Sequence, residues 1–382
     1  MIRRPAMAFG HDMAQTSLGD HLRRIRDGLL SSRRFQRLAA AFLLTRPIAR
    51  RRAADLFDLC AGFVYSQVLV VCVRLRLFQQ LRPGPLTAAA LAARASIPPD
   101  AMGVLLEAAA ALRLLERREE RYGLGPLGAA ILGNPGIAAM VEHHAALYAD
   151  LSDPVAFLRE DACGCRLSSY WPYATGDAVG LTREAVSPYT ALMSASQPMV
   201  AEMVLGAYSF RKHRCLLDIG GGDGSFLVSV SQVAPKLELK LLDLPEVAAI
   251  ARDKLCTAGL ASRATVIGGD FLKTPLPQGA DVISLIRVVH DHDDEVVLDL
   301  FTRIRNALPP DGALVIGEPM SASRGGADAL SAYFALYLLA MGSGRPRSFV
   351  ALQRLLSRSG FSDVRDRPTR IPLIASVIVA RR

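Results

Sequence analysis

The chain has 382 residues, 51% of them hydrophobic and 21% charged, which excludes a disordered protein and suits two separate cores. Six cysteines at irregular spacings, with no CxxC pair, argue against a zinc site and favour reduced, structural thiols. A redox or metal role for Cys163 and Cys165 is the alternative. The net charge of +9 comes entirely from residues 1–52, where twelve Arg oppose three Asp, because the remaining 33 basic and 33 acidic side chains cancel.

Residues 1–52 form a basic extension. They lack a basic segment followed by an apolar core and a cleavage site, so we expect no export and a cytoplasmic protein. Apolar residues recur at helical spacing between arginines, as they do in segments that lie on anionic membrane surfaces: Leu18, Leu22, Ile25 and Leu29. The extension therefore predicts peripheral contact with an anionic membrane; packing on a partner subunit, or disorder, is the alternative.

Residues 53–150 have helical periodicity. The apolar run at 59–73 is shorter than the roughly 20 residues that span a bilayer, so it predicts a buried helix. It also exceeds what one small domain covers, so we expect a homodimer. The following residues have the pattern of a winged helix-turn-helix: a helix at 86–94, a turn, a helix at 101–114 and a hairpin at 115–124. Glu107 is the only charged side chain of residues 101–112, so we expect no nucleic-acid binding.

Residues 151–210 connect this region to a second domain at 211–382. A helix is expected at 188–205, and the aromatic segment at 170–173 suits either a substrate wall or ordinary hinge packing. Five short apolar strands then alternate with helices: 215–219, 237–242, 264–267, 282–289 and 313–317. This pattern predicts a doubly wound, Rossmann-like α/β sheet, whose ligands bind at the carboxyl ends of the strands.

Gly220, Gly221 and Gly222 follow the first strand and open a helix, so backbone and helix N–H groups can approach a ligand closely. Such turns serve NAD, FAD and S-adenosyl-L-methionine alike. Asp218 lies immediately before the glycines. Its carboxylate would repel a pyrophosphate but can accept hydrogen bonds from a cationic amino-acid group, which favours S-adenosyl-L-methionine.

Two further strands are followed by acids on the same edge. Asp243 is placed to bind both ribose hydroxyls. Asp270 can accept a hydrogen bond from an adenine amino group while Phe271 packs against the base. Any one of these acids could be a solvated loop residue, but three at successive strand ends indicate a nucleoside site.

His290 follows the fourth strand, where a histidine can serve as general base because its pKa lies near working pH. Glu318 follows the fifth strand and can hold the imidazole in its tautomer. His292 and its neighbouring acids raise the question of a metal, but they fit the acidic first turn of a helix, so we expect no metal: Asp291, Asp293 and Asp294.

These residues resemble the small-molecule O-methyltransferases that include plant phenolic and animal hydroxyindole enzymes. The resemblance implies an S-adenosyl-L-methionine-dependent enzyme whose N-terminal domain dimerises and walls the partner's substrate pocket. It adds Arg287, from the Arg-x-x-His segment, to the cofactor site. The chain departs from the family at His292, where a Trp is usual, and at Pro346, where plant members have a second Glu that frames the base.

Within this family, the chain is similar to the hydroxyneurosporene and demethylspheroidene O-methyltransferases of purple bacteria. The similarity lies in residues 53–69, in the 170–173 segment and in the Arg-rich basic extension. This likeness implies an apolar acceptor, the tertiary hydroxyl of an acyclic carotenoid, and a protein peripheral to the inner or photosynthetic membrane. The alternatives are another apolar acceptor, such as a bacteriochlorophyllide or an aromatic polyketide, and a winged-helix regulator that has lost catalysis. A flavin or NAD oxidoreductase is a third class.

Overall fold

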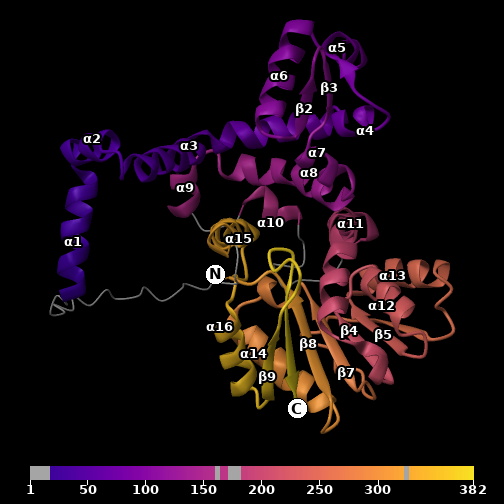
Figure 1. Ribbon diagram of the computed structural model, residues 1–382. Coiled ribbons are helices and arrows are strands. Elements are labelled where there is room, and N and C mark those ends of the chain that lie inside the picture. The colour runs from indigo at the N-terminus through magenta and orange to yellow at the C-terminus, as the bar shows by residue number, and fades with distance from the viewer. Residues whose placement is uncertain (1–17, 160–163, 171–181, 322–326) are drawn as a thin grey trace. The chain divides into compact units, whose positions relative to one another are not determined.

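The computed structural model describes residues 18–159, 164–170, 182–321 and 327–382 (Figure 1). The chain divides into two compact units, Met1–Leu69 and Val70–Arg382, and each is described by itself. Cys163 and residues 171–173 of the aromatic segment lie outside the described residues, as do the first 17 residues of the basic extension.

The first unit contains α1 (Leu18–Ser31), α2 (Arg33–Ala41) and most of α3 (Arg46–Arg74). Ser32 separates α1 from α2, and its hydroxyl accepts a hydrogen bond from the Phe35 amide at the start of α2. The apolar stripe predicted for α1 is present and exposed, and the side chains of Leu38 and Phe42 are exposed beyond it.

Helix α3 corrects the expectation of a buried helix at 59–73. Only Val70 and Cys72 of α3 are buried in the single chain, whereas Leu59 and Phe63 are exposed. The helix extends 13 residues further toward the N-terminus than the apolar run, and by length and composition it is capable of crossing a membrane. Most of the apolar run of α3 is therefore not buried among the described residues.

The second unit begins with the winged-helix region predicted from the sequence. Helices α4 (Leu77–Leu81), α5 (Ala88–Ala95) and α6 (Pro99–Ala111) accompany a three-stranded sheet of order β1-β3-β2, formed by Leu86–Thr87, Arg121–Leu124 and Leu115–Arg118. Glu107 on α6 accepts hydrogen bonds from Tyr122 Oη at 2.5 Å and Arg117 at 2.9 Å. Its carboxylate therefore binds the two strands of the hairpin in its own domain.

Five helices lead into the second domain: α7 (Pro126–Leu132), α8 (Pro135–Asp150), α9 (Pro154–Arg159), α10 (Arg166–Tyr170) and α11 (Arg183–Ala207). Thr182 caps α11 by accepting from the Ala185 amide. Helices α8 and α11 pack closely, since a Cβ on Gly136 would lie 2.6 Å from the Ala195 carbonyl oxygen. Helix α11 thus joins the helical region to the sheet.

The second domain is a seven-stranded sheet of order β6-β5-β4-β7-β8-β10-β9. The strands are β4 (Cys215–Ile219), β5 (Glu238–Asp243), β6 (Ala264–Gly268), β7 (Val282–Ile286), β8 (Ala313–Glu318), β9 (Ser362–Arg367) and β10 (Ser376–Arg381). The first five are parallel, as predicted, and the Rossmann-like fold is confirmed. Strands β9 and β10, which are antiparallel to their neighbours, were not predicted from the sequence.

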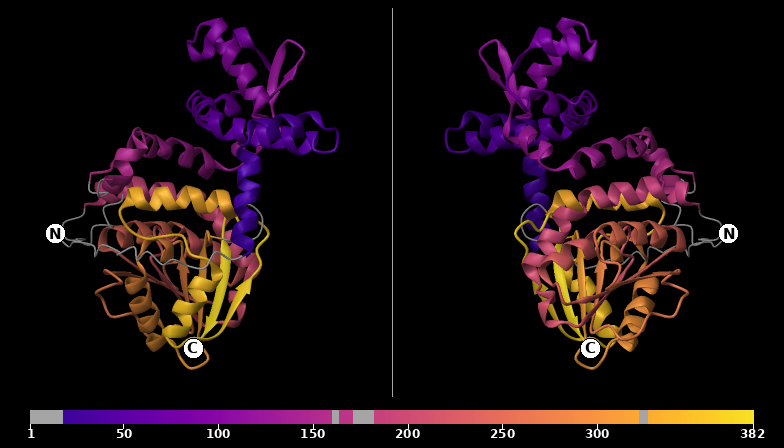
Figure 2. Two further views of the ribbon diagram at one scale, coloured as in Figure 1. Left: turned by 90° about the vertical axis from the view of Figure 1, so that its left-hand side faces the viewer. Right: turned by 90° about the vertical axis from the view of Figure 1, so that its right-hand side faces the viewer.

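Helices cover both faces of this sheet (Figures 1 and 2). Alternate residues of β4 enter different cores: Leu217 packs on α14 (Asp294–Ala307) and α16 (Phe349–Arg358), whereas Leu216 packs on α11 and α12 (Ser225–Val233). Helix α13 (Pro245–Thr257) lies on the Leu216 side. Helix α15 (Ala327–Met341) lies across the carboxyl edge of the strands (Figure 2).

Candidate active site

A cavity of about 260 Å³ lies at the carboxyl ends of the central parallel strands, just below the range of roughly 300–1,000 Å³ that is usual for small-molecule sites. The sheet supplies one wall and α11 the other. Eight of the ten site residues predicted from the sequence line it: Asp218, Gly220, Gly221, Gly222, Asp243, Asp270, Phe271 and Arg287. His290 and Glu318 are not part of the lining, although the neighbouring Asp291 and His292 are.

The glycine loop has no room for side chains at two positions. Gly220 has φ +65°, and a Cβ on it would lie 2.8 Å from a methyl group of Val288. A Cβ on Gly221 would lie 2.7 Å from Asp218 Oδ2. Gly222 also has positive φ, but the space around it is open. The loop therefore presents bare backbone to the cavity, as a closely bound ligand requires.

Asp218 is almost completely buried near the end of β4. Ser284 donates a hydrogen bond to its Oδ1 at 2.5 Å, while Oδ2 has no hydrogen-bond partner among the described residues. Burial, together with the nearby charge of Asp243, raises the pKa of Asp218 to about 7, against the opposing effect of the Ser284 hydrogen bond. An orphaned carboxylate oxygen at a cavity wall is a position for a cationic or donating ligand group.

Asp243 ends β5 and is fixed by the backbone. Its two carboxylate oxygens accept from the Gly222 and Leu244 amides, both at 2.8 Å. Burial raises its pKa to about 6, and these two amides oppose the rise. Each oxygen keeps a further lone pair for a ligand hydroxyl.

Asp270 and Phe271 lie two and three residues beyond β6 rather than at its end. Asp270 accepts from the Leu272 amide at 2.9 Å, and the Phe271 ring meets His292 edge-on with centroids 5.6 Å apart. The turn after β6 therefore brings both side chains to the cavity. His292, where the family usually has Trp, is the aromatic neighbour of Phe271.

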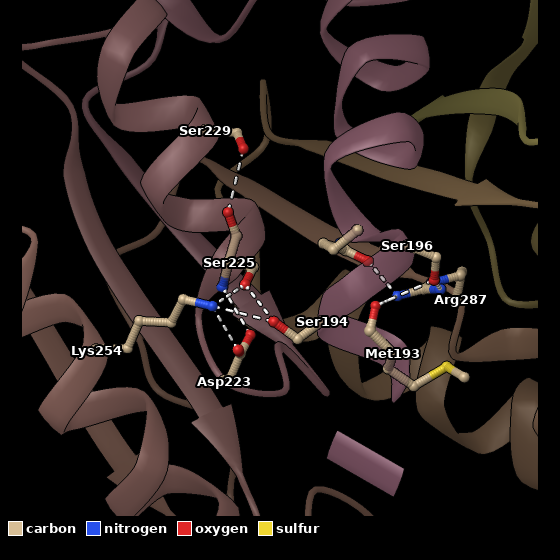
Figure 3. A network of polar contacts seen from close by, with 9 residues as sticks. Met193, Ser194, Ser196, Asp223, Ser225, Ser229, Lys254 and Arg287 are labelled. Atoms are coloured by element: carbon tan, nitrogen blue, oxygen red, sulfur yellow. Dashed lines mark hydrogen bonds and ion pairs between the residues drawn. The ribbon is translucent and has the colours of Figure 1, made fainter. Parts of the chain in front are cut away.

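Arg287 follows β7 in the left-handed region, with φ +58°. Such a conformation is rare outside glycine and marks a position that its surroundings enforce. Its guanidinium donates to Ser196 Oγ and the Met193 carbonyl, both at 2.7 Å, and to Gln197 Oε1, all on α11 (Figure 3). Its Nε is buried without a partner in the described structure. Arg287 thus ties α11 to the sheet and keeps one donor unused.

His290 lies in a one-turn 3₁₀ helix, η2 (Val289–Asp291), four residues beyond β7 rather than directly after it, because the strand ends at Ile286 and not at residue 289 as expected. Glu318, the last residue of β8, approaches its Nδ1 at 3.2 Å and also accepts from its backbone amide at 3.1 Å. On the other side of the ring, Nε2 lies 3.2 Å from Asp291 Oδ1. One buried imidazole therefore stands between two buried carboxylates.

The electrostatics of this trio favour the charged imidazole. Burial lowers the pKa of His290, but Asp291 and Glu318 together outweigh burial and raise it above its ordinary value. Burial raises the pKa of Asp291 to about 6. A proton delivered to His290 is therefore held by two neighbouring carboxyl groups.

The segment that carries Pro346 packs directly on the His290 turn. Arg345 donates its amide to the His290 carbonyl at 2.9 Å. Arg347, fully buried, donates to the carbonyls of Val289 and His292 at 2.8 and 2.7 Å and pairs with Asp294. In place of a second framing Glu, this segment supplies donors that fix the backbone on both sides of His290.

Comparison with known proteins assigns this architecture. An O-methyltransferase dimerisation domain matches residues 57–134, and an O-methyltransferase domain matches residues 148–362. The chain belongs to the O-methyltransferase family. The demethylspheroidene O-methyltransferase of Cereibacter sphaeroides is 44% identical over 355 residues, which cover 93% of each chain. That of Rhodobacter capsulatus is 39% identical over 351 residues, 92% of this chain and 88% of the relative.

A solved structure agrees with this family. The SAH-bound methyltransferase CalO1 of calicheamicin biosynthesis superposes with a TM-score of 0.73 at 26% identity, covering 87% of this chain and 98% of that one. The expected resemblance is confirmed, and the chain is an S-adenosyl-L-methionine-dependent O-methyltransferase. Its dimerisation domain supports a homodimer.

The cavity of this O-methyltransferase fits its cofactor by the chemistry of its wall. Asp218 Oδ2 and Arg287 Nε, an acceptor and a donor without partners, match the ammonium and carboxylate of the cofactor's amino-acid group. Acidic side chains outnumber basic ones in the lining, which suits a cationic sulfonium: Asp218, Asp223, Asp243, Asp270 and Asp291 against Lys273 and Arg287.

Five residues that reach the cavity from α11 were not predicted from the sequence: Tyr189, Thr190, Met193, Ser194 and Gln197. A helix was expected there, but no motif marks which of its faces meets a ligand. Asp291 was expected only in the acidic first turn of a helix, although α14 begins later, at Asp294. Within the described ranges, His, Cys, Asp and Glu side chains form no cluster of three suited to a metal.

Proposed function

We propose that this O-methyltransferase methylates the tertiary hydroxyl of an acyclic carotenoid of the 1-hydroxyneurosporene or demethylspheroidene type. The observation that carries the proposal is the buried Glu318, His290 and Asp291 trio beside an acid-lined cofactor cavity. The acceptor class is supported by two relatives that carry the name demethylspheroidene O-methyltransferase, at 44% and 39% identity over nearly the whole chain.

The cofactor, when bound, supplies a sulfonium methyl that is already activated for transfer. In the proposed assignment, Asp218 and Arg287 hold its amino-acid group and Gly220, Gly221 and Gly222 give it backbone contact. Asp243 binds the ribose hydroxyls, and Asp270 with Phe271 holds the adenine. The support is that each of these residues lines one cavity, and that the two orphaned polar atoms there have opposite hydrogen-bonding character.

His290 is the proposed general base. The Nδ1 proton directed at Glu318 would fix the tautomer that leaves Nε2 to take the acceptor's proton. Asp291 lines the cavity and lies against Nε2, so it stands between the base and the place where the acceptor hydroxyl must come. Glu318 acts through His290 as a positioning residue, and both carboxyl groups stabilise the imidazolium that proton transfer produces.

Proton removal must accompany methyl transfer. A tertiary alcohol is far less acidic than an imidazolium, so His290 cannot generate a free alkoxide beforehand. Holding the hydroxyl in line for transfer lowers the barrier by several kcal/mol, and a positioned base contributes about 10²–10⁴-fold. The second Glu of the plant members, whose place Pro346 takes, is unnecessary here because Asp291 brings a second carboxylate to the imidazole.

An apolar acceptor is supported by the aromatic residues of α15 that pack against His290. Phe334 of α15 meets the imidazole edge-on, with centroids 5.8 Å apart. The hydroxyls of Tyr333 and Tyr337 are bonded to His144 and His143 at 2.8 and 2.9 Å. The polar ends of these rings are thereby occupied, so the α15 surface beside the base is aromatic and aliphatic in character.

We assign the chain four functional segments: a basic extension at 1–52, a dimerisation domain at 53–150, a connecting and substrate-wall region at 151–210, and a cofactor-binding domain at 211–382. The extension is proposed to contact anionic membranes, where a carotenoid resides. Its support is the exposed apolar stripe of α1 and the ten Arg against two Asp between residues 18 and 52.

The test is a product analysis. Purified protein with methyl-labelled S-adenosyl-L-methionine and a hydroxylated acyclic carotenoid should yield a labelled methoxy carotenoid, and the same carotenoid lacking the hydroxyl should yield none. A phenol and a bacteriochlorophyllide serve as competing acceptors. Labelling of either in preference to the carotenoid alcohol would overturn the acceptor assignment while leaving the enzyme class intact.

A further inference from the structure

One turn of α11, residues 193–197, is held to the sheet domain from two sides (Figure 3). Arg287 binds Met193, Ser196 and Gln197, as described above. From the opposite side, Lys254 of α13 donates to Ser194 Oγ at 3.0 Å. The turn lies over the cofactor cavity, because Met193, Ser194 and Gln197 are part of its lining. Whatever fixes this turn therefore fixes the wall opposite the glycine loop.

Lys254 joins three segments at one atom. Besides Ser194, its Nζ donates to Asp223 Oδ2 at 2.6 Å and to Ser225 Oγ at 2.5 Å (Figure 3). An ammonium has three N–H donors, so these three oxygens match its full capacity. Asp223 belongs to the glycine loop and Ser225 begins α12. The lysine thus links α11, the glycine loop and α12 at the rim of the cavity.

The contact also sets the charge of a lining residue. Burial by itself raises the pKa of Asp223, but the hydrogen bonds from Lys254, Ser194 and Ser225 outweigh it, and the pKa is lowered. Asp223 is therefore ionised, and its carboxylate is directed at Lys254 as well as lining the cavity. Without the lysine, a largely buried carboxylate would face the cavity with its charge uncompensated.

We propose that Lys254 is a positioning residue for the cofactor, fastening the 193–197 turn of α11 to the glycine loop so that the two walls of the cavity keep their spacing. Lys254 does not line the cavity itself, so it acts through Ser194 and Asp223. The inference concerns cofactor retention and is independent of which acceptor the enzyme uses.

The same two helices offer a matched control. Arg183 of α11 and Asp253 of α13 form an ion pair at 3.0 Å, but both side chains are more than half exposed and neither lines the cavity. Exposed pairs contribute little because water screens them. Arg183→Ala therefore removes a link between α11 and α13 without touching the glycine loop.

The experiment measures SAH affinity by calorimetry and SAH release by stopped flow, neither of which needs an acceptor. Lys254→Met should weaken binding roughly tenfold, which corresponds to losing one charge-assisted hydrogen bond partly screened by solvent. Release should accelerate by a similar factor. With the acceptor present, the KM for S-adenosyl-L-methionine should rise while kcat at saturation stays within about twofold of wild type. Lys254→Arg should restore most of the affinity.

Arg183→Ala should bind SAH as wild type does. Ser194→Ala, which keeps the lysine and its two other partners, should weaken binding measurably, and Lys254→Met with Ser194→Ala should be no weaker than Lys254→Met alone. Unchanged affinity in Ser194→Ala, or equal losses in Lys254→Met and Arg183→Ala, would overturn the proposal. If Lys254→Met does not fold, the Ser194→Ala result decides.

Discussion

The buried trio of Glu318, His290 and Asp291 makes a sharp prediction about pH. A general base must be unprotonated, and its two carboxyl neighbours raise the pKa of His290 despite burial. The acid limb of kcat/KM should therefore lie above the ordinary histidine pKa of about 6.5, with the rate rising as pH rises through it. Replacing either carboxylate removes a stabiliser of the imidazolium, so the limb should move to lower pH in Asp291→Asn and Glu318→Gln.

The size of the effect on rate follows from the contacts. His290→Ala removes the base and should lower turnover by about 10²–10⁴-fold, toward the upper part for so poor a nucleophile as a tertiary alcohol. Glu318 makes two long contacts, 3.1 and 3.2 Å, and is fully buried. Both contacts go to Oε2, and an amide oxygen in its place can accept both but without the charge, so Glu318→Gln should cost about 1–1.5 kcal/mol, roughly 5- to 10-fold in kcat.

The assay is methyl transfer from labelled cofactor across pH, with SAH affinity measured for each variant. His213→Gln is the matched control, because His213 pairs with Asp281 at 3.1 Å, away from the cavity; it should leave the limb and kcat unchanged. Near-normal turnover in His290→Ala would mean that proximity alone carries the reaction. An acid limb that stays in place in both carboxylate variants would refute the electrostatic reasoning.

Three other predictions follow from the structure. Asp243→Ala should weaken S-adenosyl-L-methionine binding by about 10- to 100-fold, since charge-assisted bonds to the ribose are lost, and calorimetry that finds no change removes the ribose assignment. Leu59→Glu should shift the dimer toward monomer in light scattering, because a charge then enters the exposed apolar surface of α3; an unaltered dimer would place the interface elsewhere. Deleting residues 1–45 should reduce sedimentation with anionic vesicles, at about 1 kcal/mol per Arg near the surface and less in high salt, without changing SAH binding; equal sedimentation of both forms ends the membrane proposal.

The sequence predicted those parts of the fold where local pattern and burial agree. Three of the five parallel strands, β4, β7 and β8, are buried on both faces and therefore appear as apolar runs. Strand β9 has the opposite character: Ser362–Arg367 is an edge strand with four charged residues in six, so no apolar run marks it. Its pairing with β10 depends on a tertiary contact that no local pattern encodes.

The α3 error has a related cause. A long apolar run indicates that the surface of a helix will be buried, but it does not show whether the chain's own core or another molecule buries it. From the sequence, both the chain's own core and a partner subunit are expected to cover the run at 59–73, but the single chain leaves Leu59 and Phe63 exposed. The lining residues of α11 were missed for the same reason, since the face that a helix turns to a ligand is decided by contacts such as those of Arg287 and Lys254.

Pro346 illustrates how a departure from a family pattern acquires a physical meaning only in three dimensions. By sequence alone, the missing Glu puts the framing of His290 in question. The structure places Asp291, the next residue in the chain, 3.2 Å from the ring nitrogen that Glu318 does not reach. Arg347 then binds the carbonyls on either side of His290, and a Cβ on Gly344 would lie 2.2 Å from the His290 carbonyl oxygen. A turn held this tightly can keep its imidazole oriented with one carboxylate at Nδ1, which leaves the second carboxylate to come from the cavity wall itself.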